Sequence, residues 1–496
     1  MAQNFQHPFQ CIQFVKKKNG DSRNVLVASA GPKIFSYAAE SGQRLSIWPQ
    51  KGADLPDAND AGSNPENEGP PEKKRKVDPA SEQTASAASG KKSATWTNIP
   101  ILTSTPDGEY LVALTGEDKC IRVFQIEEDG SFQQISARLV PKRPCAITFM
   151  DNNDILTGDK FGDVYSMPLI PSADPRNAPK TAWQERAKKI AATSLTVHTQ
   201  RNLRSLEMQR QRAGENHDKN KDLDKPTYDH DLLLGHVSLL TDVAFVSLSS
   251  SDPSSARKRS YILSADRDEH IRVSRGPPQA HIIENYCFGH TAFISKLCIP
   301  QWAPEILISG GGDPYFLVWN WTTGQILQKV PLVEETPEAT KEVAVRSIWA
   351  ASFGPRRLVL VALEGTPFLQ YFTLETNGAI TPHQPLKTSG NILDVHVRED
   401  INTVLISVDC IREPGSTQEW RSTPVSPATL LEAFQLKQDT EMPEWETVSD
   451  SMISTINASE TEVVSATTES KEKAVLNNSL YGLEHLRKKY FGEDDA

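Results

Sequence analysis

The stretch Ile306-Leu-Ile-Ser-Gly-Gly-Gly-Asp-Pro-Tyr-Phe-Leu-Val-Trp319 contains two short apolar runs separated by a glycine-rich turn. Gly289-His290 precedes it, Ser309 ends the first run and Trp319 ends the second. Asp313 lies in the turn, six positions before Trp319, which leaves room to complete a hairpin and run along one strand. A glycine–histidine pair followed by a tryptophan, in a unit of roughly 40–45 residues, is typical of a four-stranded propeller blade.

The unit before it repeats the same register in Tyr261-Ile-Leu-Ser-Ala-Asp-Arg-Asp-Glu-His-Ile-Arg-Val-Ser274. Here Gly235-His236 leads to Ser264, Asp268 and Ser274, the last at the position of the tryptophan. Weaker copies of the strand–turn–strand outline occur at residues 28–37, 114–124, 156–165, 363–371 and 391–436. Seven units fit the range of propeller blades, so we predict an all-β, seven-bladed β-propeller over residues 1–438.

The units resemble WD40 repeats. In that family a histidine, a serine, an aspartate and a tryptophan form a hydrogen-bonded tetrad that ties each blade together, and the resemblance implies this role for His290, Ser309, Asp313 and Trp319. The same set could suggest a hydrolase, but the spacing is that of a blade and no G-x-S-x-G nucleophile motif is present. We therefore predict no catalytic residues, and we interpret residues 310–312 as turn glycines rather than a phosphate-binding loop.

Three segments differ in composition from these units. Residues 50–94 are rich in Pro, Gly, Ser, Ala, Asn and charge, residues 172–228 are polar and rich in Arg, Lys and Gln, and residues 439–475 are acidic and rich in Ser and Thr. None has enough apolar side chains to offset the entropy of ordering, so we predict two disordered insertions and a disordered linker. Beyond the linker, Leu480, Leu483 and Leu486 recur at helical spacing and predict a short helix within residues 476–496.

The composition limits the classes of protein to which the chain can belong. The chain has 496 residues, a formal net charge of -11 and no run of about 20 apolar residues that could cross a membrane. Its N-terminus has no basic region followed by an apolar stretch, so we expect no signal peptide. The six cysteines form no C-x-x-C pair, and motifs for a P-loop, a dinucleotide or a zinc site are missing from the sequence. We predict no cofactor, no metal and a reducing intracellular compartment.

The run Ala265-Asp-Arg-Asp-Glu-His-Ile-Arg-Val-Ser274 is unusually charged for a blade. With Leu233-Leu-Gly-His-Val-Ser-Leu-Leu-Thr-Asp-Val243 and Phe288-Gly-His-Thr-Ala-Phe-Ile-Ser295, it resembles the non-catalytic WD-repeat subunit of the eukaryotic tRNA (guanine-N7)-methyltransferase. The match covers about residues 232–325. The resemblance implies that the chain forms a heterodimer with a Rossmann-type methyltransferase and holds it in an active conformation. The partner would bind S-adenosylmethionine and methylate N7 of the guanosine at position 46 of tRNA.

The resemblance also implies where the partner binds. The family's D-R-D-E-x-I-[RK] run corresponds to Arg267, Asp268, Glu269, His270 and Arg272. Because Asp268 also occupies the tetrad position, we expect it to be internal and predict the other four as interface residues. Arg272 is the strongest candidate, since it shares a strand face with His270 and arginine can pair with a carboxylate through two hydrogen bonds. The alternative is a solvated arginine on a blade face.

A compact basic run, Lys73, Lys74, Arg75 and Lys76, lies in the first predicted insertion. Such runs are candidate nuclear localisation signals, so we predict a nuclear protein, with a merely solvated charge run as the alternative. The second insertion has a basic excess between residues 180 and 225 that could contact tRNA phosphates. Because the whole chain is acidic, we expect most of the affinity for tRNA to lie with the partner.

Two other functions are compatible with the sequence. A nuclear WD-repeat scaffold for chromatin or ribosome-assembly complexes would have the same blades and the same basic run. A propeller can also carry a hydrolase site in its channel, because a fold does not determine a function. The proteins that copurify with the chain distinguish the scaffold hypothesis from the methyltransferase hypothesis.

Overall fold

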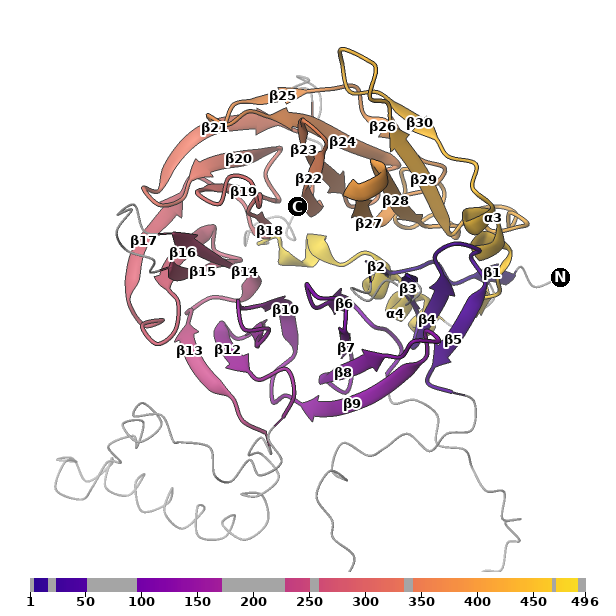
Figure 1. Ribbon diagram of the computed structural model, residues 1–496, viewed down its shortest axis with the longest axis horizontal. Helices are drawn as coiled ribbons and strands as arrows, with labels where there is room; N and C mark the ends of the chain where they lie inside the picture. The colour runs from indigo at the N-terminus through magenta and orange to yellow at the C-terminus, as the bar shows by residue number, and fades with distance from the viewer. Residues whose placement is uncertain are drawn as a thin grey trace, which may run out of the picture.

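The computed structural model describes residues 4–16, 24–50, 96–171, 228–249, 258–333, 342–465 and 470–488. Seven antiparallel sheets are arranged as blades around a central channel (Figure 1). Each blade has four strands in chain order from the channel outwards, and the sixth has one additional short strand. The prediction of an all-β, seven-bladed propeller is confirmed.

The strands of each blade follow one another along the chain. Blades 1 and 2 consist of β2 (Cys11–Val15), β3 (Val25–Ala30), β4 (Lys33–Ala38), β5 (Arg44–Trp48), β6 (Ile101–Ser104), β7 (Tyr110–Thr115), β8 (Cys120–Ile126) and β9 (Phe132–Leu139). Blades 3 and 4 consist of β10 (Pro144–Phe149), β11 (Ile155–Asp159), β12 (Asp163–Met167), β13 (Asp231–Gly235), β14 (Leu240–Ser249), β15 (Lys258–Asp266), β16 (His270–Arg275) and β17 (Ile283–Phe288). Blade 5 consists of β18 (Ile294–Cys298), β19 (Ile306–Gly311), β20 (Tyr315–Asn320) and β21 (Gln325–Pro331). Blades 6 and 7 consist of β22 (Val345–Phe353), β23 (Arg356–Leu363), β24 (Phe368–Leu374), β25 (Ile380–Pro382), β26 (Leu386–Lys387), β27 (Ile392–Arg398), β28 (Thr403–Val408), β29 (Leu431–Leu436) and β30 (Trp445–Thr447), with a 3-10 turn, η2 (Glu399–Ile401), after β27.

The apolar runs form strands because both of their faces are covered by neighbouring blades. Every residue of β3 and of β28 is buried. Separate apolar clusters fill the spaces between adjacent blades, so the core is a ring of clusters rather than one centre.

The innermost strands β2, β6, β10, β14, β18, β22 and β27 each contact the next, and β27 contacts β2 to complete the circle. Carboxylates on two of these strands bind backbone amides of the neighbouring blade. Asp242 Oδ2 accepts a hydrogen bond from Leu297 N at 2.9 Å, which links blades 4 and 5. Asp394 Oδ2 accepts one from Ile12 N at 2.8 Å, which links blade 7 to blade 1 where the ring closes.

Asp394→Asn is expected to change how stability depends on pH. Burial raises the pKa of Asp394 to about 6, above the ~3.9 of an aspartate in an unfolded chain. Between these values the folded state binds more protons than the unfolded state, so this carboxyl makes the protein more stable as the pH falls from 7 to 5. Asn keeps an acceptor oxygen for Ile12 N but does not titrate, so the native protein should gain up to about 1 kcal/mol over the variant in this range. Denaturant unfolding at both pH values measures the gain, and an equal pH response in both proteins would contradict it.

Segments from both ends of the chain close the ring. β1 (Asn4–Gln6) pairs with β31 (Val463–Ser465), and α3 (Ser451–Ala458) packs against β29. The prediction that residues 439–475 are disordered is wrong, because β30, α3 and β31 lie within them. Asp450 caps α3 by accepting a hydrogen bond from Met452 N at 3.0 Å, and Met452, Ile453 and Ile456 are buried in the cluster between blades 7 and 1. Because the apolar face of α3 consists of only three residues, the composition of this Ser/Thr-rich segment did not predict a helix.

The last described residues, 470–488, form a segment that we call the strap. It consists of α4 (Ser470–Leu480) and η3 (Leu483–Leu486), followed by Arg487 and Lys488. In Figure 1 the yellow segment runs from α4, beside β2 to β4, across the middle of the ring. A helix does lie near the C-terminus, but it begins at Ser470 inside the predicted linker and ends at Leu480. Leu483 and Leu486 lie in η3, so the three leucines do not share one helix as predicted.

The predicted insertions, residues 50–94 and 172–228, lie almost wholly outside the described residues, so their disorder stays a prediction. The first connects blades 1 and 2. The second lies between β12 and β13, which pair with each other and keep blade 3 intact. Tyr228, assigned to the second insertion, is buried in the same cluster as Leu169, so the predicted disorder is wrong for this residue.

Candidate partner-binding surface

The predicted tetrad of blade 5 is a chain of hydrogen bonds. His290 Nδ1 lies 2.7 Å from Asp313 Oδ2, and His290 Nε2 lies 2.7 Å from Ser309 Oγ. Trp319 Nε1 donates to the same Ser309 oxygen at 2.8 Å, and all four side chains are buried. Burial alone would raise the pKa of Asp313, but hydrogen bonds from His290 and Thr291 outweigh it and lower the pKa. These four side chains connect the loop before β18 to β19 and β20, and none of them presents an exposed nucleophile.

Blade 4 uses a different aspartate from the one that the spacing predicted. His236 Nε2 lies 2.7 Å from Ser264 Oγ, but His236 Nδ1 faces Asp266 Oδ2 at 3.2 Å. The other oxygen of Asp266 accepts hydrogen bonds from the backbone N–H groups of Asp268 and His270, at 2.9 and 3.0 Å. The tetrad role predicted for Asp268 is therefore wrong, and its carboxylate lies at the surface.

Residues 267–269, which we call the charged turn, connect β15 to β16 and are covered by the end of the strap. Arg267 Nε donates to Leu486 O at 2.7 Å. Lys488 Nζ lies 3.1 Å from Asp268 Oδ1 and 3.0 Å from Glu269 Oε1. Two of the four predicted interface residues, Arg267 and Glu269, thus already have partners within the chain.

Arg272, the strongest predicted interface residue, is buried rather than solvated. Its Nε donates to Ser274 Oγ at 2.8 Å, its Nη1 donates to Gly235 O at 3.1 Å, and only 9% of the residue is exposed. Ser274 stands where blade 5 has a tryptophan, and the smaller side chain leaves room for the guanidinium to fold against the blade. The alternative of a solvated arginine on a blade face is therefore wrong, and the interface role of Arg272 stays a prediction.

A hollow of about 760 Å³ lies between blades 3 and 4. Arg272 lines it together with the carboxylates of Asp163 and Asp231 and the rings of Phe245 and His281. Arg272 therefore reaches the surface through this hollow, whose other charged lining residues are the carboxylates of Asp151, Asp154, Asp163 and Asp231.

Two exposed aromatic residues on the outermost strand of blade 4 were missed by the sequence analysis. The rings of Tyr286 and Phe288, which we call the aromatic pair, stack with centroids 5.4 Å apart, and 60% of Phe288 is exposed. In the β16–β17 register His270 lies opposite Phe288, and Arg272 lies opposite Tyr286. The His270 ring also meets Phe288 edge-on at 5.4 Å. The sequence does contain a signal for this pair: two aromatic residues flank Cys287, so they point to the face of the strand opposite the buried cysteine.

A basic cluster lies on the turns of blades 2 and 3, and we define it as Lys119, Lys142, Arg143 and Lys160. Backbone hydrogen bonds hold the three turns side by side, from Val140 N to Lys119 O and from Lys160 N to Arg143 O, both at 3.1 Å. Lys142 Nζ lies 3.8 Å from the ring centroid of the exposed Phe161. Partial burial and the nearby positive charge of Arg143 lower the pKa of Lys160, because both disfavour its charged form.

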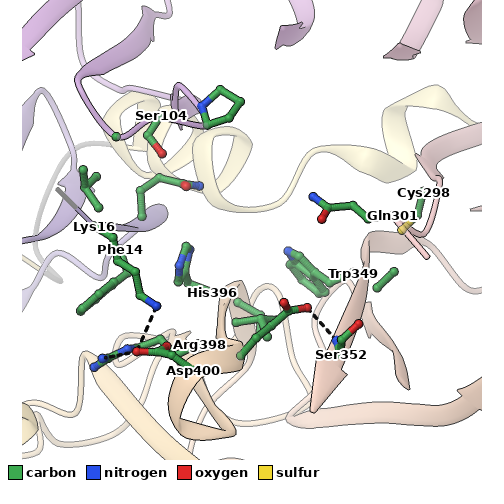
Figure 2. A pocket seen from close by; sticks show the side chains of 18 of the residues that line it. Phe14, Lys16, Ser104, Cys298, Gln301, Trp349, Ser352, His396, Arg398 and Asp400 are labelled. Carbon is green, nitrogen blue, oxygen red and sulfur yellow. Dashed lines mark hydrogen bonds and ion pairs between the residues drawn. The ribbon is translucent and has the colours of Figure 1, made fainter. Parts of the chain in front are cut away.

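A second hollow, of about 870 Å³, lies at the mouth of the channel where the innermost strands end (Figure 2). Asp400 lies 3.1 Å from Lys16 Nζ and 3.2 Å from Arg398 Nη2, and the guanidinium of Arg398 lies 3.9 Å from the Phe14 ring centroid. Burial lowers the pKa of His396 to about 4, so this ring is neutral at pH 7. These charges neutralise one another rather than converging on a ligand.

Within the described ranges, no group of three or more His, Cys, Asp and Glu residues could hold a metal ion. No described helix is long and apolar enough to cross a membrane. The basic run Lys73, Lys74, Arg75 and Lys76 lies outside the described residues, so its role as a localisation signal stays a prediction.

Comparison with known proteins gives the family. Residues 26–434 match the family described as "tRNA methyltransferase TRM82 WD40 domain". The chain belongs to this family. Two relatives match it from end to end: an Aspergillus oryzae protein is 52% identical and an Aspergillus clavatus protein 53% identical, each over all of both chains.

Both Aspergillus relatives are named tRNA (guanine-N(7)-)-methyltransferase non-catalytic subunit trm82. A Kluyveromyces lactis protein of the same name is 30% identical over 61% of this chain and 60% of its own length. The predicted family is confirmed, and the names agree with the prediction of a non-catalytic subunit. Among solved structures, "Structure of U3-55K" matches with a TM-score of 0.50, 12% identity and coverage of 86% of this chain and 95% of that chain. At that identity the likeness shows the propeller fold alone.

Proposed function

We propose that this TRM82 chain binds and stabilises the catalytic subunit of a tRNA (guanine-N7)-methyltransferase and is required for N7-methylguanine at position 46 of tRNA. The observation that carries the proposal is the end-to-end similarity to relatives named as the non-catalytic subunit of that enzyme. The buried blade tetrads agree with a supporting role, since they leave the Ser/His/Asp sets no access to a substrate. The cofactor and the methyl transfer then belong to the partner.

The proposed docking surface for the catalytic subunit is on blade 4. It consists of the charged turn with Arg267 and Glu269, of His270, of the aromatic pair, and of the hollow lined by Arg272. Exposed aromatic rings that fill partner pockets are the usual energetic centres of interfaces, and surrounding charges add specificity. Arg272 contributes from inside the hollow instead of projecting from the strand.

The basic cluster of blades 2 and 3 is the proposed contact of this subunit with tRNA. It combines four cations, one of which (Lys142) lies over an exposed aromatic ring, and such a combination attracts phosphates and permits stacking with a base. Two carboxylates of the same region are occupied elsewhere, because Glu117 accepts a hydrogen bond from Thr97 N and Asp118 pairs with Arg122. A third, Asp159, is buried and accepts a hydrogen bond from Phe161 N. The cluster adjoins blade 4, since His236 N donates to Gly162 O at 2.8 Å across the intervening turn.

Changing Lys119, Lys142 and Lys160 to glutamate is expected to weaken tRNA binding by the heterodimer about tenfold or more near 0.15 M salt. The slope of log affinity against log salt should also become shallower by roughly 2 to 3, because up to three phosphate contacts are lost. The control is Lys387→Glu with Lys437→Glu, which removes an exposed lysine of blade 6 and a partly exposed lysine of blade 7. An equal loss in the control would show that the effect is only one of net charge.

The chain is also proposed to be nuclear, on the strength of the run from Lys73 to Lys76 in the sequence. Alanine at these four positions should leave a fluorescently tagged chain in the cytoplasm. Unchanged nuclear fluorescence would remove this assignment while leaving the partner hypothesis intact.

The function itself is tested in cells that lack this chain but still express the catalytic subunit. Loss of N7-methylguanine at position 46 of tRNA, restored by the full chain, is the expected result. Normal methylation without the chain would favour the alternative, a nuclear scaffold for chromatin or ribosome-assembly complexes.

A further inference from the structure

The strap is held firmly at its start. Leu476, Leu480 and Tyr481 are buried in the cluster between blades 7 and 1, and the Tyr481 hydroxyl donates to the carboxylate of Asp409. The backbone N–H groups of Gly482 and Leu483 then donate to Glu364 Oε1, at 2.9 and 3.2 Å. Release of this part would expose apolar surface and leave buried carboxylates without their donors.

The end of the strap is held lightly. None of the η3 residues is buried, and η3 has no side-chain cap. Arg487 makes the firmest contacts of this end: it donates to Gly312 O and Val343 O at 3.2 and 3.0 Å, and its guanidinium lies 5.5 Å from the Phe293 ring centroid. The ion pairs of Lys488 with Asp268 and Glu269 join side chains that are 32–45% exposed, where solvent screens them.

The lightly held end reaches the edge of the exposed aromatic surface. Glu269, which binds Lys488, is followed in the chain by His270, whose ring contacts Phe288. A protein seated on Phe288 and His270 would therefore come within reach of the charged turn. In the uncomplexed chain, Arg267 binds a backbone carbonyl of the strap, and Asp268 and Glu269 bind the ammonium group of Lys488. An extended partner segment with a lysine or arginine would supply the same two groups, a backbone carbonyl and a cation.

We propose that residues 484–488 and the catalytic methyltransferase compete for the charged turn, so that the partner binds by displacing the end of the strap. The inference rests on the proposed function, because it takes the methyltransferase as the occupant of blade 4. In the uncomplexed subunit the end of the strap keeps Arg267, Asp268 and Glu269 paired. The start of the strap stays anchored throughout, so displacement opens only the last turn.

The test is the affinity of the full chain for the purified catalytic subunit. Arg487→Ala with Lys488→Ala should make binding about tenfold tighter, because the competitor loses its side-chain contacts. Lys473→Ala with Lys437→Ala is the matched control: it removes two cations far from the charged turn and should leave the affinity unchanged. Hydrogen exchange of the amides of residues 484–488 should become faster when the partner is added to the native chain.

Three other outcomes overturn the proposal. Weaker binding of the Arg487/Lys488 variant, with slower amide exchange on partner addition, would mean that the end of the strap is part of the interface. Unchanged affinity and exchange would mean that the partner does not use the charged turn. If the native chain binds no methyltransferase at all, the proposed function fails and this inference fails with it. This outcome is distinct from the first two, in which the native chain still binds the methyltransferase.

Discussion

Phe288→Asp should reduce the affinity of the subunit for the catalytic methyltransferase by about 100-fold or more, while the propeller stays folded. Phe288 is 60% exposed in the uncomplexed chain, so a carboxylate there is hydrated and costs little stability. In the complex the same carboxylate would be buried without a partner, in place of a ring that stacks on Tyr286 and contacts His270. Loss of a central aromatic contact typically costs about 2–4 kcal/mol, and each 1.4 kcal/mol is about tenfold in affinity.

The control for this variant is Phe368→Asp. Phe368 is 43% exposed on β24 of blade 6, outside the proposed surface. Calorimetry or surface binding with the purified partner measures both affinities, and circular dichroism verifies that both variants are folded. Equal binding by Phe288→Asp and the native chain would place the partner elsewhere, and an equal loss in Phe368→Asp would mean that the effect is not local.

His290→Ala is expected to lower the free energy of unfolding by about 3–5 kcal/mol. The histidine side chain is fully buried and links Asp313 to Ser309, so its removal leaves the Asp313 carboxylate buried without its main donor. Trp319 would also lose an ordered acceptor, because the Ser309 hydroxyl would be free to rotate away. Denaturant unfolding measures the loss.

His270→Ala provides the matched control for the tetrad variant. The His270 side chain is 45% exposed, so its removal should change stability by no more than about 0.5 kcal/mol. A loss below about 1 kcal/mol in His290→Ala would argue against a structural tetrad. That result would reopen the hydrolase hypothesis.

The blade count could be predicted because each blade is encoded locally. Two apolar runs and a tight turn recur seven times. The first long insertion falls between two blades, and the second falls between β12 and β13, which pair without it. The error in blade 4 shows the limit of spacing. Two residues after the tetrad serine, blade 5 has Gly311 but blade 4 has Asp266, whose carboxylate reaches His236 before Asp268 can. Spacing alone cannot tell which of two nearby carboxylates forms the hydrogen bond with the histidine.

The site was harder to predict because it depends on contacts between distant parts of the chain. Strand alternation placed His270 and Arg272 on one face correctly, but only the structure reveals that Arg272 folds against Ser274. The strap covers the charged turn from more than 200 residues away in sequence, and no local pattern encodes that contact. The aromatic pair has a visible alternation, yet its exposure follows from its position on an outermost strand.

The measurement that tests the central claim most directly is purification of the full tagged chain from its own cells, followed by identification of what comes with it. Our account predicts one methyltransferase in roughly equal amount, retained by the native chain and by Phe368→Asp but lost from Phe288→Asp. Recovery of histones or pre-ribosomal factors with no methyltransferase would contradict the account.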